Sequence, residues 1–180
     1  MTLLDFLGFS KTPSTPAAAP AAPGDTDTIR RIVKALQSLD ADKARRIAAF
    51  AFILSRVANA DMEISEEETR EMERIVMHWG GLPEDQAVLV VQIARHQNIL
   101  FGGTDNFIVT REFKNSASPQ EKEELLHCLF AVSAADDSIS SVEEGTISQI
   151  AGELGLSREE LIAVRSQYRD KRAVMKDLPR

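Results

Sequence analysis

Apolar residues recur three and four positions apart along most of the chain after residue 25, which is the spacing of one face of an α-helix. The pattern predicts helices over residues 26–39, 40–60, 65–79, 82–100, 105–115, 121–135, 140–154 and 157–168. The helix at 40–60 is apolar on every side between Ile47 and Leu54, so we expect it and its counterpart 121–135 to be central. The period-two alternation of a strand is missing, and the sequence therefore predicts an all-α fold.

The expected ends of these helices carry their own signals. A serine followed three residues later by a glutamate is the spacing of a capping box, in which each side chain accepts a hydrogen bond from the other residue's backbone N–H. The spacing occurs at four predicted helix starts: Ser65 with Glu68, Ser118 with Glu121, Ser140 with Glu143, and Ser157 with Glu160. Gly80, Gly81 and Gly155 stand where helices are expected to stop, because glycine readily adopts the left-handed conformation of a helix end.

The stretch at residues 60–68 is nearly repeated at residues 135–143, at an offset of 75. The two copies share Ala, Asp, Ile, Ser and Glu at the same relative positions. The match extends to the pairs Leu54/Leu129, Val57/Val132, Ile75/Ile150 and Gly80/Gly155. We therefore predict an internal repeat, centred on residues 40–100 and 118–169, in which two helical hairpins are related by a pseudo-two-fold axis.

Residues 1–24 differ from the rest of the chain: an apolar leader is followed by a linker rich in Pro and Ala. Such a linker is semi-extended and does not pack a core, so we place the helical domain at residues 25–180. Two interpretations of the leader stay open. It is either a disordered segment that folds at most onto its own domain, or a docking peptide for a membrane surface or another protein.

Composition narrows the class of function. The formal net charge of −7 and the pI of about 5.1 argue against nucleic-acid binding, which needs clustered Lys and Arg, and favour cations or basic protein partners. A single cysteine, Cys128, excludes an internal disulfide and fits a reducing compartment. No stretch approaches the roughly 20 apolar residues of a membrane span, and the first residues lack the basic start of a signal peptide. We expect a cytoplasmic protein.

Catalytic motifs are missing from the sequence. It contains no nucleophile elbow, no phosphate-binding Gly-rich loop and no His-Glu-x-x-His metal helix. The histidines His78, His96 and His127 fall on separate predicted helices, so no two of them share a helical face. We expect neither an enzyme nor a small-molecule substrate.

Two acidic loops remain as candidate chemistry, and each directly follows an apolar helix. Asp61 begins the first loop and Asp136 the second, with Glu68 and Glu143 at the eighth position of each. Carboxylate oxygens are the ligands that Ca²⁺ and Mg²⁺ prefer. The loops are not EF-hands, because they lack glycine at the sixth position and glutamate at the twelfth.

The same four acids also have a structural interpretation. Capping boxes explain Glu68 and Glu143 without a metal. Asp61 and Asp136 meet the negative end of a helix dipole, which costs about 0.3–1 kcal/mol and would be offset by an Asx turn or by a bound cation. Three alternatives stay open: capping and turn chemistry alone, a weak divalent-cation site, or catalysis by the carboxylates. If the repeats pack about a pseudo-two-fold axis, both loops lie at the same end of the molecule.

These loops resemble those of the TerB family, which includes the tellurite-resistance protein TerB and the N-terminal domain of the co-chaperone DjlA. The matching motifs are Ala-Asp-Met-Glu-Ile at 60–64, Ala-Asp-Asp-Ser-Ile at 135–139 and Leu-Gly-Leu-Ser-Arg-Glu-Glu at 154–160. In the family pattern a glycine follows each Asp, whereas here Met62 and Asp137 stand at that position. A backbone with positive φ tolerates Asp137 better than Met62.

The resemblance implies a bundle of about seven to nine helices and a role in stress response, to tellurite and other chemicals or at the envelope, peripheral to the inner membrane. It also implies that Asp61, Glu68, Asp136 and Glu143 bind a divalent metal. The DnaJ-like His-Pro-Asp signature of a co-chaperone is missing. We expect a non-enzymatic stress-response module with protein partners. The alternative is a helical adaptor that docks a basic partner on its acidic face and binds no metal.

Overall fold

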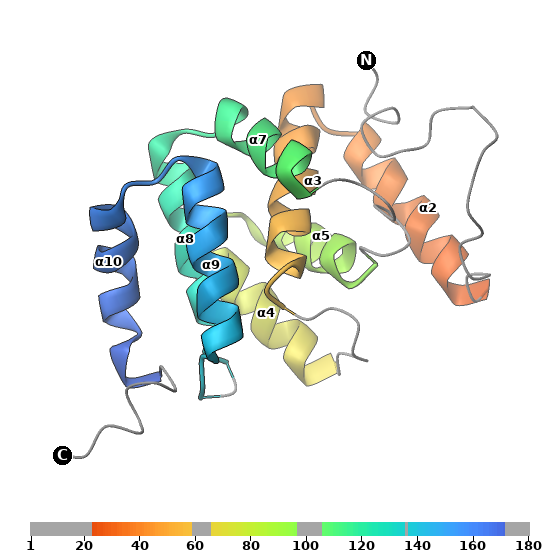
Figure 1. The fold of residues 1–180 in the computed structure, drawn as a ribbon. Helices are drawn as coiled ribbons and strands as arrows, with labels where there is room; N and C mark the ends of the chain where they lie inside the picture. Colours follow the sequence, from red (N-terminus) through yellow and green to blue (C-terminus); the bar gives the residue numbers. More distant parts are fainter. Residues whose placement is uncertain (1–22, 59–65, 97–105, 136, 172–180) are drawn as a thin grey trace, which may run out of the picture.

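The computed structural model describes residues 23–58, 66–96, 106–135 and 137–171. Within these ranges the chain forms helices and no strand, so the predicted all-α fold is confirmed (Figure 1). The elements are α2 (Pro23–Gln37), α3 (Ala41–Ser55), α4 (Glu66–Trp79), α5 (Glu84–Arg95), α7 (Asn106–Ser116), α8 (Pro119–Ser133), α9 (Ser141–Leu154), α10 (Arg158–Gln167) and the 3₁₀ turn η1 (Arg169–Lys171). The leader at residues 1–22 lies outside the described residues.

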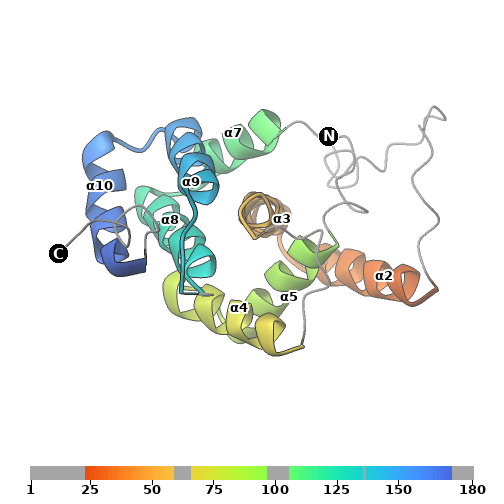
Figure 2. The same ribbon diagram turned by 60° about the horizontal axis from the view of Figure 1, so that its bottom comes forward.

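Helix α3 is the centre of the bundle, as its apolar sequence predicts. Figure 2 shows it nearly end-on, with α4, α5, α7, α8 and α9 around it and α2 and α10 at the two outer edges. Every residue from Ile47 to Leu54 is buried, because a helix that is apolar on all sides can hide its side chains only among other helices. Helix α8 adds a second buried row, including Leu125, Leu129 and Phe130.

Helix α3 ends earlier than the sequence pattern indicates. The prediction that it reaches Ala60 is wrong, because the helix stops at Ser55 with Arg56 as its C-cap. The backbone N–H groups of Arg56 and Val57 donate to the carbonyls of Ile53 and Leu54, three residues back, which is the tightening typical of a last helical turn. Similarly, α5 ends at Arg95 and not at Leu100.

The predicted repeat has a counterpart in the helix positions. Helices α4 and α9 begin 75 residues apart and end 75 residues apart. Ile75 and Ile150, which the repeat pairs, are both buried. A pseudo-two-fold relation between the two halves stays a prediction.

A mostly buried ion pair joins the end of α3 to α9. The Arg56 guanidinium donates to the two Glu153 carboxylate oxygens at 2.7 Å and 3.2 Å, and the side chains are only 9% and 13% exposed. Arg56 also donates to the Thr110 hydroxyl of α7 at 3.0 Å. The hydrogen bond from Arg56 lowers the pKa of Glu153, although burial opposes that shift. This cluster fixes where α3 ends relative to α7 and α9.

Replacing Glu153 with glutamine should therefore destabilise the fold strongly. The change leaves the Arg56 charge buried without a carboxylate, which costs about 3 kcal/mol or more. A thermal melt should show a loss of roughly 6–12 °C in Tm. Because the folded pKa of Glu153 is lowered, its contribution to wild-type stability is present above its unfolded pKa and is lost as the pH falls through the folded pKa.

The matched control is Asp27→Asn, which breaks the exposed Arg30–Asp27 pair on α2. We expect that change to cost less than about 1 kcal/mol. Equal losses of Tm in the two variants would contradict the role given to the Arg56–Glu153 pair.

Candidate functional site

The acidic end of the molecule is the candidate site, and it lies where α4 and α9 begin. Both helices start at the lower end of the bundle in Figure 1. Of the four predicted ligands, Glu68 and Glu143 lie in the first turns of these helices. Asp61 and Asp136 lie outside the described residues. The structure thus brings the two helix starts to one end and leaves the full ligand set a prediction.

Glu143 forms the capping box that the sequence predicts. Its Oε2 accepts from the Ser140 backbone N–H at 2.8 Å, and the Ser140 hydroxyl accepts from the Glu143 N–H at 3.2 Å. The same boxes form at Ser118 with Glu121 and at Ser157 with Glu160. Capping occupies only one carboxylate oxygen of Glu143, so its Oε1 can still serve a ligand.

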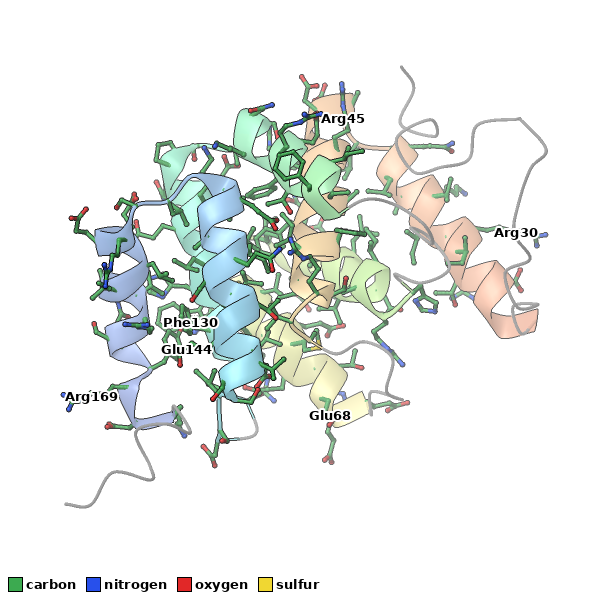
Figure 3. The ribbon with its side chains drawn as sticks, viewed as in Figure 1. Arg30, Arg45, Glu68, Phe130, Glu144 and Arg169 are labelled. Atoms are coloured by element: carbon green, nitrogen blue, oxygen red, sulfur yellow. The ribbon has the colours of Figure 1, made fainter. Side chains whose placement is uncertain are left out.

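Glu68 is the more exposed of the two predicted ligands that the structure describes. Its side chain is exposed at the start of α4, near the lower edge of Figure 3. Glu66 and Glu67 share the same first turn and are also exposed. Acidic residues are stabilised there by the positive end of the helix dipole, so this turn can carry three carboxylates without a bound ion.

The second loop turns through a left-handed residue. Asp137, which stands at the family's glycine position, has φ of +68°. Aspartate is among the few residues other than glycine that adopt this conformation readily. The sequence-based expectation for Asp137 is therefore confirmed, while Met62 in the first loop lies outside the described residues.

The C-terminal turn η1 binds this second loop. The Lys171 ammonium pairs with the Asp137 carboxylate. The backbone N–H of the buried residue Ile139 donates to the Lys171 carbonyl at 2.8 Å. The sequence analysis did not predict this contact between Lys171 and the second acidic loop. The sequence feature that could have indicated it is the cluster of basic residues near Lys171, which lies far along the chain from the loop.

A further ion pair holds α10 to the start of α9. The Arg165 guanidinium lies 3.1 Å from the carboxylate of Glu144, which is mostly buried. Figure 3 labels Glu144 beside Phe130, on the side of the bundle that faces α10. The C-terminal cations Arg165 and Lys171 thus neutralise part of the negative charge at the acidic end.

An aromatic cluster anchors the chain between α10 and η1. The Tyr168 ring stacks on Phe130 at 5.4 Å between centroids, and its hydroxyl donates to the His127 carbonyl at 3.2 Å. The His127 ring in turn stacks on Trp79 at 5.0 Å. Burial raises the pKa of Tyr168 to about 12. The cluster joins α4, α8 and the C-terminal segment into one packed unit.

His127 is partly buried in this cluster. Its Nδ1 is buried and has no hydrogen-bond partner in the described part of the chain. Burial lowers the pKa of His127, and the negative charge of Glu123 partly opposes that shift. The ring contacts with Trp79 and Tyr168 give the imidazole a packing role in this cluster.

The donors at the acidic end suit a hard cation, because carboxylates are the oxygen ligands of Ca²⁺ and Mg²⁺. Within the four described ranges, however, no three His, Cys, Asp or Glu side chains come close enough together to hold a metal ion. A site at this end would need Asp61 or Asp136 as well. The described residues therefore supply only part of the predicted ligand set.

Comparison with known protein families decides the identity of the domain. The family model described as tellurite resistance protein TerB matches residues 46–166, about two thirds of the chain. The chain belongs to the TerB family. Comparisons with curated proteins and with solved structures gave no match.

The match covers the central part of this TerB-family fold. It begins within α3 and ends within α10, so both acidic loops lie inside it. Helix α2 and the turn η1, which carries Lys171, lie outside the matched segment. None of the helices in the described residues has the length and apolar character needed to cross a bilayer.

The buried imidazole predicts how the stability of this TerB-family domain depends on pH. The pKa of His127 is lowered in the folded state. As the pH falls below about 6.5, the pKa of the unfolded state, His127 therefore binds a proton more readily in the unfolded protein than in the folded protein. Stability should therefore fall as the pH drops from about 7.5 to about 5.5. We expect His127→Phe, which keeps the ring contact with Trp79, to reduce this fall in Tm.

The control is His78→Gln, which removes an exposed histidine beside the same tryptophan. Thermal melts at the two pH values should give this control the wild-type pH dependence. If His127→Phe loses as much Tm between the two pH values as the wild type, His127 is not the group responsible.

Proposed function

We propose that this TerB-family protein is a non-enzymatic stress-response module that binds a divalent cation, Ca²⁺ or Mg²⁺, at its acidic end. The proposed ligands are Asp61, Glu68, Asp136 and Glu143. The observation that carries the proposal is the Lys171 ammonium on the Asp137 carboxylate. The ammonium group of Lys171 is a positive charge bound at the second acidic loop, where we also propose the metal. The loop therefore attracts positive charge.

The local geometry is compatible with this role. The Glu143 cap leaves Oε1 for a metal, and Asp137 adopts a left-handed conformation shortly before the start of α9. A bound divalent cation would neutralise the clustered carboxylates and cross-link the loops that precede α4 and α9. The chain's own contribution is to hold its carboxylates at two helix starts, where the dipoles favour negative charge.

Location and partners form part of the same proposal. We place the protein in the cytoplasm, peripheral to the inner membrane, with the leader at residues 1–10 as its contact with the membrane or a partner protein. The support is the apolar character of that leader and the long Pro/Ala-rich linker that follows it.

Isothermal titration of the full chain with Ca²⁺, Mg²⁺ and, for selectivity, Zn²⁺ tests the cation site. We expect saturable heat from Ca²⁺ or Mg²⁺ in the wild type and its loss in Asp61→Asn combined with Asp136→Asn, because these changes remove two of the four charged ligands. In cells exposed to tellurite, the same double variant should fail to restore the tolerance that the wild type restores.

The matched control is Asp42→Asn on the first turn of α3, since it removes an acid far from the acidic loops. This variant should bind cations as the wild type does. Absence of heat from the wild type at millimolar ion would rule out the cation site.

A second prediction concerns Lys171. If its ammonium competes with the metal for the second loop, Lys171→Met should tighten cation binding by about threefold to tenfold, which corresponds to the roughly 1 kcal/mol of a partly exposed ion pair. The Lys171 and Asp137 side chains are 45% and 80% exposed, so the Tm should change little. Titration of the variant with the same ions measures the effect.

The comparison variant is Arg169→Met, which removes the same charge from the same turn without touching a described acid at this loop. An equal gain in affinity from both variants would show a general effect of net charge and would contradict direct competition by Lys171.

The exposed first turn of α4 favours one alternative function. Glu66, Glu67 and Glu68 together form an anionic patch that could dock a basic protein partner without any metal. In this case the titration with ions gives no heat, while a Lys-rich peptide binds with an affinity that falls as salt is added.

A further inference from the structure

A cavity of about 90 Å³ opens at the end of the molecule opposite the acidic loops. Helices α3 and α8 both begin at the upper end in Figure 1, and their first turns line the cavity together with parts of α5 and α7. The opening is much smaller than the several hundred Å³ of a typical cofactor site. Its size suits one aliphatic side chain.

The floor of the cavity is apolar. Phe50 of α3 and Phe113 of α7 meet edge to face, with ring centroids 6.1 Å apart, and both are buried. Ile47 and Leu82 complete the floor. An aliphatic group placed here would leave water and contact the two rings, which is the main source of affinity for a small ligand.

One polar group in the cavity wall lacks a partner. Gln86 of α5 is only 7% exposed, and its side-chain amide forms no hydrogen bond with any residue that the structure describes. The amide atoms of Gln86 are not among the fully buried unpaired atoms of the described residues, so they still reach solvent through the cavity and stay available for hydrogen bonds. The Gln86 amide therefore offers one donor group and one acceptor group to a ligand in this cavity.

The rim carries charges of both signs on two different helices. Lys43 and Arg46 of α3 supply the positive charges, and Glu121 and Glu124 of α8 supply the negative charges. Arg46 lies 3.7 Å from Glu121, whereas the Lys43 ammonium forms no ion pair within the described ranges. The charges sum to zero, so the rim matches a ligand that itself carries one charge of each sign.

We propose that this cavity binds a free α-amino acid with an aliphatic side chain, of the size of leucine. The side chain lies on Phe50 and Phe113, the carboxylate meets the Lys43 ammonium and the Gln86 amide, and the α-ammonium meets Glu124. The proposal goes beyond the cation site, because none of these residues belongs to an acidic loop. It assigns the domain a second site, for a small zwitterion.

The test is an NMR titration of the ¹⁵N-labelled full chain with millimolar L-leucine. We expect saturable shifts centred on the backbone amides of Phe50, Gln86 and Phe113. L-leucinamide lacks the carboxylate, N-acetyl-L-leucine lacks the ammonium, and glycine lacks the side chain. Each of these probes should bind at least about tenfold more weakly, since each gives up one of the three contacts.

Variants locate the site. Lys43→Met and Glu124→Gln should each weaken leucine binding at least about fivefold, and Gln86→Met should do the same without loss of the folded spectrum. Asp42→Asn is the matched control, because it changes the charge next to Lys43 without lining the cavity. Asp61→Asn combined with Asp136→Asn should leave leucine binding unchanged, which separates this proposal from the cation site.

Three results would overturn the proposal. The first is the absence of saturable shifts with any probe. The second is binding of leucine that Lys43→Met, Glu124→Gln and Gln86→Met all leave intact. The third is equal binding of L-leucine and N-acetyl-L-leucine amide. That result would show that the cavity binds the apolar side chain of a peptide and does not recognise the α-ammonium and α-carboxylate groups of a free amino acid.

Discussion

The burial of α3 on every side is the constraint on which the rest of the structure depends. From Ile47 to Leu54 this helix presents no polar side chain, so other helices must surround it (Figure 2). The charged side chains of this helix therefore lie toward its two ends. At its C-terminal end the Arg56 guanidinium is paired with Glu153 of α9, and at its N-terminal end Lys43 and Arg46 reach the rim of a cavity. The proposed ligand Asp61 follows the C-terminal end of α3 in the sequence, and the cavity lies beside the N-terminal half of the helix, where Ile47 and Phe50 line it.

The acidic end shows why an acidic sequence pattern alone does not identify a metal site. Glu143 caps α9, Glu144 pairs with Arg165, and Asp137 pairs with Lys171, so each of these acids has a structural task that needs no ion. If a metal binds in the second loop as proposed, the Lys171 ammonium beside it repels the ion, and a weak site is the expected outcome.

Local features of the fold follow from the sequence, and contacts between distant residues do not. The capping boxes at Ser118, Ser140 and Ser157 depend on residues three apart, and the left-handed Asp137 on a single position, so both were predictable. The pair of Arg56 with Glu153 joins residues 97 apart, and no helical periodicity contains that information. The cavity beside Gln86 was hidden for the same reason, since its wall comes from several helices whose packing only the coordinates give.

The attachment of the C-terminal segment bears on how the proposed metal would enter the second loop. The segment is held by the Ile139–Lys171 backbone hydrogen bond and by the ring of Tyr168 on Phe130, both with buried partners. The Lys171–Asp137 ion pair is exposed and contributes little to stability. The ammonium can therefore swing away from Asp137 while the main chain of η1 stays in place. A metal bound in the loop as proposed would therefore displace the Lys171 side chain and leave the C-terminal segment in place.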